Sequence, residues 1–256
     1  MKMPRALLAA IAAIAMLAVN AAPAFAALTG VSAYAYGEQV RFTLLGGTTV
    51  SSGPTPTVGP IAPSGGSASS TLLSASVPGL LTTGVLTVAV NGSTASGSVT
   101  SSATVNDVSA LGGVFTATGV QAECAVNNHG DTSGSTTLAS AVLAGQSLSA
   151  NPGPNTTVAF STLAASGYVV LNEQTYNAAT NTLTVNAVHL YVTGGTLGTG
   201  DIVISHVECG AVPGGAAPII PEAPLALLLP LTALAVFGGA IFLSTRRGPA
   251  TLRLGR

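Results

Sequence analysis

Residues 168–193, YVVLNEQTYNAATNTLTVNAVHLYVT, give the clearest indication of the fold class. They hold two runs rich in β-branched and aromatic residues, Tyr168–Tyr176 and Thr182–Thr193, and the five residues Asn177–Asn181 join them. Runs of this composition are typical of β-strands, and a connection of this length is typical of a hairpin. The stretch therefore predicts two antiparallel strands that pair with each other.

Similar runs recur along the chain, at Val31–Leu45, Gly84–Asn91, Val114–Val126 and Asp201–Cys209. No helical period of 3.6 residues appears outside the two ends of the chain. Many short strands separated by turn residues favour two packed sheets. We expect an all-β domain over residues 27–210, which is an antiparallel β-sandwich or a jelly-roll-like fold.

Two segments depart from the strand pattern. Ser51–Ser76 is rich in Pro, Gly and Ser, which favours a long flexible surface loop. Residues 211–222 have a similar composition and stand directly before an apolar run, so we expect them to be a spacer.

The start of the chain has the pattern of a secretory signal. Lys2 and Arg5 precede the apolar run Ala6–Val19, and Ala24-Phe25-Ala26 fits the A-x-A cleavage pattern. We expect residues 1–26 to be a signal peptide that is removed after Ala26. An uncleaved N-terminal anchor is the alternative.

The end of the chain has the pattern of a membrane anchor. Residues 223–243 carry no charge, and as a helix they would be about 31 Å long, which matches the hydrocarbon core of a bilayer. The four Arg residues of segment 244–256 follow, and the positive-inside tendency places them in the cytoplasm. We expect one transmembrane helix at 223–243, a basic cytoplasmic tail at 244–256 and the N-terminal part outside the cell. The alternatives are a buried core helix and processing at Leu229–Ala233, which resembles a sortase signal.

The charge of the expected outer part excludes nucleic-acid binding. Residues 27–221 contain seven carboxylates and a single basic residue, Arg41, which leaves a formal net charge of −6. Binding to nucleic acid requires clustered Lys and Arg side chains that displace counterions. We therefore expect the partners to be the membrane, through the C-terminal helix, and a component of the cell surface or cell wall.

Cys124 and Cys209 are the only cysteines. Each lies in a predicted strand in step with apolar residues: Val120 and Val126 accompany Cys124, and Val203 and Val207 accompany Cys209. Disulfides persist in the oxidising setting of an exported protein, and the short spacings of redox or zinc motifs are missing. We expect a Cys124–Cys209 disulfide, with two free buried thiols as the alternative.

The sequence contains no known catalytic motif. It has no G-x-S-x-G, no H-E-x-x-H and no glycine-rich phosphate loop with Lys. Glu173 would suit one half of a glycosidase carboxylate pair, but the sequence assigns no second carboxylate. The turn Asn127–Asp131, which includes His129, has too few carboxylates for calcium. We therefore assign no catalytic residue, no metal ligand and no cofactor.

The other two histidines lie in predicted strands. His189 stands between Val188 and Leu190, which indicates a packed or surface-facing strand residue. His206 and Glu208 share one face of a strand, where they would form an imidazole–carboxylate pair, hold a cation, or simply be two solvated polar side chains.

The chain resembles the choice-of-anchor P family of exported bacterial surface proteins. The resemblance covers residues 31–210 and rests on Ala35-Tyr36-Gly37, Cys124, Leu171-Asn172-Glu173-Gln174, Val188-His189 and Cys209-Gly210, in that order. It implies an exported domain that different C-terminal anchors carry, with no established reaction and no functional residues to transfer.

Two classes of function follow. The first is a non-enzymatic, membrane-anchored extracellular surface protein with a structural or adhesive role. The alternative is an extracellular hydrolase that acts on glycan or peptide. An enzyme would need several titratable groups that converge, and the few acids and histidines are scattered along the chain. The lack of Trp also removes the stacking platform of many sugar-binding proteins.

Overall fold

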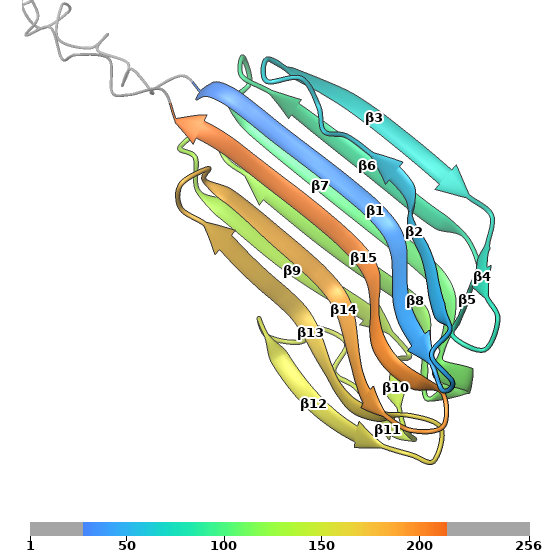
Figure 1. The fold of residues 1–256 in the computed structure, drawn as a ribbon. Coiled ribbons are helices and arrows are strands. Elements are labelled where there is room, and N and C mark those ends of the chain that lie inside the picture. The colour runs from blue at the N-terminus through green and yellow to red at the C-terminus, as the bar shows by residue number, and fades with distance from the viewer. Residues whose placement is uncertain (1–27, 214–256) are drawn as a thin grey trace, which may run out of the picture. The chain divides into compact units, whose positions relative to one another are not determined.

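A computed structural model describes residues 28–213, and these residues form a domain of antiparallel sheets (Figure 1). The predicted all-β class and the antiparallel pairing are confirmed. One sheet, here called sheet A, has six strands. In spatial order they are β12 (Thr156–Ser161), β13 (Ser166–Asn177), β14 (Thr182–Gly194), β15 (Gly198–Pro213), β1 (Leu28–Leu44) and β2 (Thr49–Val58). The predicted hairpin over residues 168–193 is the pair β13 and β14.

The second sheet, here called sheet B, has nine strands. Its main path runs through β11 (Gln146–Ser147), β10 (Val142–Leu143), β8 (Phe115–Val126), β7 (Ser98–Ala110), β5 (Leu81–Thr83) and β4 (Ala75–Val77). Three further strands pair beside this path: β6 (Leu86–Ser93) with β7, β3 (Gly65–Leu72) with β6, and β9 (Thr132–Ala139) with β8. The single helical element of residues 28–213 is the short 3₁₀ turn η1 (Leu111–Gly113).

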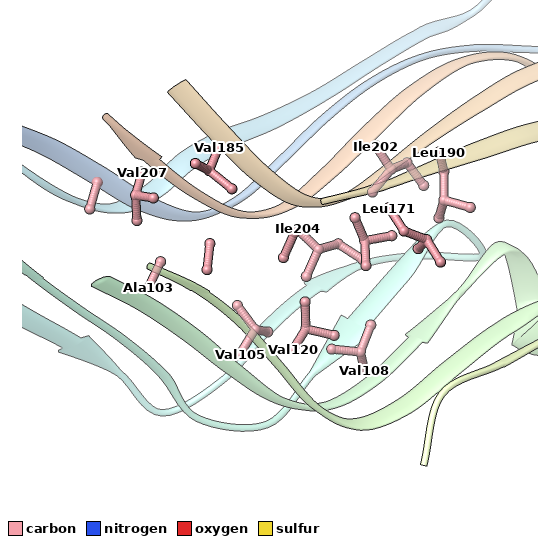
Figure 2. Close-up of a cluster of buried hydrophobic side chains, with 14 of the residues drawn as sticks. Ala103, Val105, Val108, Val120, Leu171, Val185, Leu190, Ile202, Ile204 and Val207 are labelled. Atoms are coloured by element: carbon pink, nitrogen blue, oxygen red, sulfur yellow. The ribbon is translucent and has the colours of Figure 1, made fainter. Parts of the chain in front are cut away.

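The two sheets pack face to face over one apolar core, in a β-sandwich-like arrangement. Figure 2 shows Ile204 and Leu171 of sheet A above Val105 and Val120 of sheet B, all of them buried. The predicted alternation of β8 is confirmed, because Val120, Ala122, Cys124 and Val126 all lie in the core. Burial of aliphatic side chains contributes about 1.5–3 kcal/mol each, so this core is the main stabilising element.

The described domain begins and ends at one place. β1 and β15 are neighbours in sheet A, and their antiparallel pairing runs from Leu28 opposite Pro213 to Leu44 opposite Gly198 (Figure 1). The two expected flanking segments are therefore attached at the same end of these two strands.

The expected flexible loop over Ser51–Ser76 is wrong. Most of β2 and all of β3 lie within this segment. The proline content led to the wrong expectation of a loop. Proline cannot donate a hydrogen bond within a central strand, but it is accepted on an edge strand. Pro54 and Pro56 lie in β2, which is the outer strand of sheet A, and β3 pairs with a single partner, β6.

The expected spacer at 211–222 begins later than predicted, because β15 continues to Pro213. The predicted signal peptide, the transmembrane helix and the basic tail lie outside the described residues. Within residues 28–213, no helix has the length and hydropathy needed to cross a bilayer.

A line of irregular backbone crosses four strands of sheet A. Pairing is interrupted at one level in each strand, at Asn172 in β13, Ala187 in β14, Ser205 in β15 and Gly37 in β1. Asn172 and Ser205 have left-handed backbones, with φ of 50° and 62°. The strict alternation of inward and outward side chains is reset along this line, so that both Ala187 and Val188 are buried.

Ser205 uses this inward position to connect the sheets. Its hydroxyl donates to the carbonyl of Ala103 at 2.6 Å and accepts the N–H of Ala122 at 2.9 Å. The reset also moves Val203 to the opposite face from Val207 and Cys209, because Val203 lies in the same row as His189 and Gln39. The expectation that Val203 shares the face of Cys209 is therefore wrong.

Candidate functional site

The outer face of sheet A carries most of the titratable side chains that could perform chemistry. Here the structure brings together Glu173 of β13, His189 and Tyr191 of β14, and Asp201 of β15. We name these four residues, with Asn186, the His189 cluster. Asn186 and His189 are three residues apart, and they reach the same face because the alternation of β14 is reset between them at Ala187.

Glu173 is the centre of the His189 cluster. Its Oε2 accepts hydrogen bonds from Asn186 Nδ2 at 2.6 Å and from His189 Nδ1 at 2.7 Å, and its Oε1 accepts one from the Tyr191 hydroxyl at 3.0 Å. His189 Nδ1 is the donor in its bond to Glu173, because an ionised carboxylate can only accept. Three donors on one carboxylate fix both the position of Glu173 and its charge.

The pKa of Glu173 reflects two opposing effects. Burial raises it, but the hydrogen bonds from His189, Asn186 and Tyr191, together with the charge of His189, outweigh burial and lower the pKa to about 2. Burial also raises the pKa of the Tyr191 phenol, and the neighbouring Glu173 charge raises it further. The cluster is therefore built around a permanent anion and a neutral phenol.

The second ring nitrogen of His189 has a different environment. His189 Nε2 is buried and has no hydrogen-bond partner within residues 28–213, while Asp201 Oδ2 lies 3.7 Å away, beyond hydrogen-bond distance. Asp201 is thus the second carboxylate near Glu173 that the sequence could not assign. His189 stands between the two.

A second group, the His206 cluster, lies on the same face. It comprises His206, Glu208, Tyr34 and Tyr36, and it meets the first cluster at Asn186. His206 Nδ1 is 2.6 Å from Asn186 Oδ1, and its Nε2 is 3.3 Å from Glu208 Oε1. The hydrogen bond with His206 lowers the pKa of Glu208 against the opposing effect of burial. Of the three alternatives for His206 and Glu208, the structure shows the imidazole–carboxylate pair, and the expectation of two solvated side chains is wrong for His206, which is buried.

Four of the five tyrosines lie in these two groups or beside them. The ring of Tyr36 stacks on His206 with a centroid distance of 4.2 Å, and the ring of Tyr168 stacks on Tyr191 at 4.8 Å. Aromatic rings from different strands therefore lie together on the outer face of sheet A, which the sequence did not predict. In each of these two stacks, one face of each ring is covered by its neighbour.

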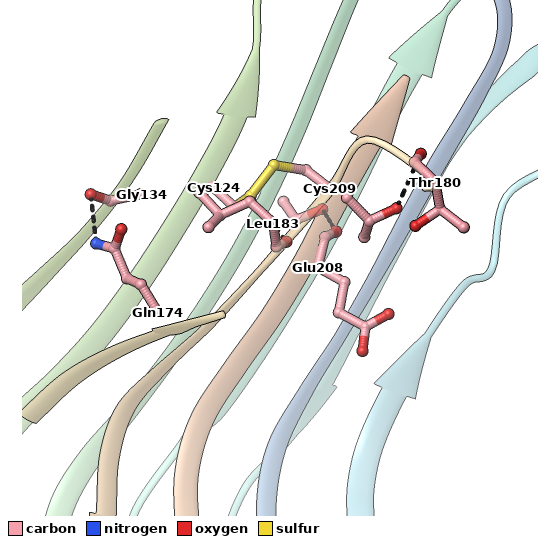
Figure 3. Close-up of a disulfide and its surroundings, with 9 residues drawn as sticks. Cys124, Gly134, Gln174, Thr180, Leu183, Glu208 and Cys209 are labelled. Atoms are coloured by element: carbon pink, nitrogen blue, oxygen red, sulfur yellow. Dashed lines mark hydrogen bonds between the residues drawn. A yellow bond between two sulfur atoms is a disulfide. The ribbon is translucent and has the colours of Figure 1, made fainter. Parts of the chain in front are cut away.

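The disulfide is the one predicted site feature that the structure confirms directly. Cys124 of β8 and Cys209 of β15 are bonded, with their Cα atoms 5.8 Å apart, and the bond connects sheet B to sheet A (Figure 3). Figure 3 also shows Gln174 of β13 reaching across to Gly134 of β9, and its Nε2 donates to that carbonyl at 3.0 Å. The two sheets are therefore connected by a covalent bond and by polar side chains.

The turn Asn127–Asp131 satisfies its own polar groups. Asn127 Oδ1 accepts the backbone N–H groups of His129 and Asp131, and Asn127 Nδ2 donates to the Asp131 carboxylate at 3.0 Å. In the part of the chain that the structure describes, no group of three or more His, Cys, Asp or Glu side chains is arranged to hold a metal ion.

The protonation of the carboxylates limits the chemistry of this face. A glycosidase needs one carboxylic acid that keeps its proton near neutral pH. The pKa values of Glu173 and Glu208 are lowered, so both side chains have lost their protons there. Burial raises the pKa of Glu38, but this side chain is fully buried, bonded to Ser52, and unable to reach a substrate.

Comparison with known proteins adds no assignment, because no family model, curated protein or solved structure matches this chain.

The low pKa of Glu173 predicts acid sensitivity. Its folded-state pKa of about 2 lies below the ordinary value of 4.5, so the stabilising contribution is complete above pH 4.5 and is lost as the pH falls toward 2. We expect the free energy of unfolding, measured by urea titration, to fall over this window in the native protein. The fall should be shallower in Glu173→Gln. The exposed Glu123→Gln on sheet B controls for the loss of one negative charge, and equal slopes in all three proteins would refute the prediction.

Proposed function

We propose that the chain is an exported surface protein, held at the membrane by residues 223–243, whose β domain has a structural or adhesive role and performs no reaction. The observation that carries this proposal is the Cys124–Cys209 disulfide between the two sheets. Such bonds persist outside the cytoplasm, which agrees with the signal-like residues 1–26. The resemblance to the choice-of-anchor P family supports the same kind of protein.

The pairing of β1 with β15 supports the anchored arrangement. Leu28 and Pro213 are paired residues, so a cleaved start and a membrane-bound continuation of the chain would both stand at one end of these strands. The opposite ends of the strands, including the turns after Leu44 and Gly194, are then free for contact with the surroundings.

The polar face of sheet A supports a non-catalytic role. Its two carboxylates with lowered pKa values are bonded to neighbouring side chains, and neither holds a proton near neutral pH. Groups of this kind maintain a rigid and specific surface. This is the behaviour expected of a display or adhesion domain.

A hydrolase is the second candidate, and one observation favours it. The Glu173–His189 pair resembles a carboxylate that orients a basic imidazole, and His189 Nε2 has no hydrogen-bond partner among the described residues. Turnover of a glycan or peptide substrate that His189→Gln abolishes, in protein with an unchanged unfolding midpoint, would establish this alternative over our proposal.

Cell fractionation tests the proposed anchoring. The full chain should be found in the membrane fraction, with its N-terminus at Ala27. A chain that stops after Pro221 should leave that fraction, because it lacks the apolar run 223–243. A chain that stops after Arg247 is the matched control, and it should remain membrane-bound.

Two outcomes would contradict this proposal. Retention of the shorter chain would place the anchor elsewhere, for instance in an uncleaved segment 6–19. Covalent attachment to the cell wall, with loss of the tail, would show that the segment Leu229–Ala233 is processed.

A further inference from the structure

The outer face of sheet B is a regular lattice of hydroxyl groups. Five neighbouring strands, in the order β3, β6, β7, β8 and β9, place fifteen outward side chains in three rows that the strand register defines. The rows are Ser67–Asn91–Thr100–Ala125–Ser133, Ser69–Ala89–Ser102–Glu123–Ser135 and Thr71–Thr87–Thr104–Gln121–Thr137. We name these fifteen residues the hydroxyl face; ten of them are Ser or Thr, so hydroxyl chemistry dominates its contacts.

The hydroxyl groups form columns on alternate strands. Within the three rows, the residues of β3, β7 and β9 are all Ser or Thr, while β6 and β8 between them carry Ala89 and Ala125. Strands are about 4.8 Å apart, and outward neighbours along one strand are about 6.8 Å apart. The columns therefore repeat about every 10 Å across the sheet.

Two hollows lie on this face, and they repeat with the columns. One surrounds Ala89 and the other surrounds Ala125, with volumes of about 410 and 390 Å³. Both are lined by Thr100 and Ser102 of β7, which form the wall between them. Ala89 and Ala125, the shortest side chains of the hydroxyl face, each line one of the hollows.

The hydroxyl groups of this face are available to a partner. Among residues 28–213, Thr137 is the one member of the ten that donates to another protein group, Asn151 Oδ1 at 3.5 Å. The single charge, Glu123, accepts a hydrogen bond from Gln121 at 2.7 Å. The remaining hydroxyl groups face solvent with both their donor and acceptor capacity unused by the protein.

The chemistry of the face selects one class of partner. Without basic residues it cannot hold an anionic polymer, and without Arg, Met or aromatic side chains it lacks the groups that dominate protein interfaces. Repeated hydroxyl groups pair with repeated hydroxyl groups, and two equal hollows in a line suit a partner with a repeating unit. We propose that the hydroxyl face binds an uncharged, extended polysaccharide, which lies across the strands over Ala89 and Ala125.

This inference rests on the proposed adhesive role and names its ligand class. It also assigns binding to sheet B, and not to the aromatic groups of sheet A. The affinity comes from many weak, wet contacts, since no side chain of the hydroxyl face is aromatic.

Sedimentation with insoluble polysaccharides tests the inference. The full chain in detergent micelles should sediment with at least one of microcrystalline cellulose, chitin and insoluble starch. The double variant A89V/A125V places a larger, branched side chain at the floor of each hollow, and strands accept valine well, so we expect at least a tenfold weaker apparent affinity. A139V is the matched control, because Ala139 faces outward on β9 but lies opposite Gly119, outside the hollows.

The results separate this inference from the proposed function. Equal unfolding midpoints of the three proteins would show that the variants are folded, and T100V with S102A repeats the test at the shared wall if A89V/A125V unfolds. No sedimentation with any of the three polymers, or equal binding by A89V/A125V and A139V, would overturn the hydroxyl face as a glycan site. Self-association that A89V/A125V abolishes would also overturn it, in favour of a second copy of the chain. Membrane retention of the full chain and its release by truncation would stand in each case.

Discussion

Replacement of both Cys124 and Cys209 by Ala is expected to lower the free energy of unfolding by about 4–5 kcal/mol. The two residues are 85 positions apart, and a closed loop of this length removes much of the conformational freedom of the unfolded chain. Small domains are stable by only about 5–15 kcal/mol, so a loss of this size would leave the domain close to unfolding. Urea titration of the native and double-variant proteins measures the difference.

Reduction provides the matched control for this prediction, because it opens the bond without changing a residue. The native protein with reductant should unfold at nearly the same urea concentration as the double variant. A difference below 1 kcal/mol between oxidised and reduced protein would contradict the prediction. Free thiols in the unreduced, unfolded protein would contradict the bond itself.

Ile204→Ala is expected to cost about 2–5 kcal/mol. Ile204 is fully buried and lies between the sheets, close to Val105 and Val120 (Figure 2). Its removal leaves a cavity in the core, just before the irregular position Ser205, whose hydroxyl holds the strand to sheet B by two hydrogen bonds, so that the site cannot easily collapse.

Val85→Ala is the control for the Ile204 variant. Val85 is 37% exposed, so its truncation removes apolar atoms without opening a central cavity. The two variants are compared by the same urea titration. Equal losses of stability would show that the packing around Ile204 is not a dominant contribution.

The sequence predicted the strands whose side chains alternate by polarity. β13, β14 and β8 combine β-branched or aromatic residues with regular turns, and all three were located within a few residues. β3 and β7 were missed because their outward positions are Ser and Thr, and their composition is close to that of loops. β2 was missed because an edge position accepts the prolines that a central strand would reject.

The His189 cluster could not be predicted for a geometric reason. Strand periodicity places residues three apart on opposite faces, so Asn186 and His189 were not expected to reach the same carboxylate. The reset at Ala187 reverses this rule for β14, and the same reset at Ser205 brings Asp201 and His206 to one face of β15. One contact of the cluster could have been predicted from the sequence. Glu173 lies opposite Asn186, and this follows from the register of the β13–β14 hairpin.

The position of the disulfide along β15 has a mechanical consequence. In the anchored arrangement that we propose, load would enter through the end of β15, and a strand that peels from one end breaks its hydrogen bonds one at a time. Cys209 lies four residues from Pro213, so only the pairs of Gly210–Pro213 with the start of β1, and the contacts of Gly210 and Ala211 with the start of β14, can peel before tension reaches the covalent bond. From there the pull passes to Cys124 in β8, a strand flanked by β7 and β9. Force on the tail would thus be shared by both sheets through the disulfide, instead of acting on β15 alone.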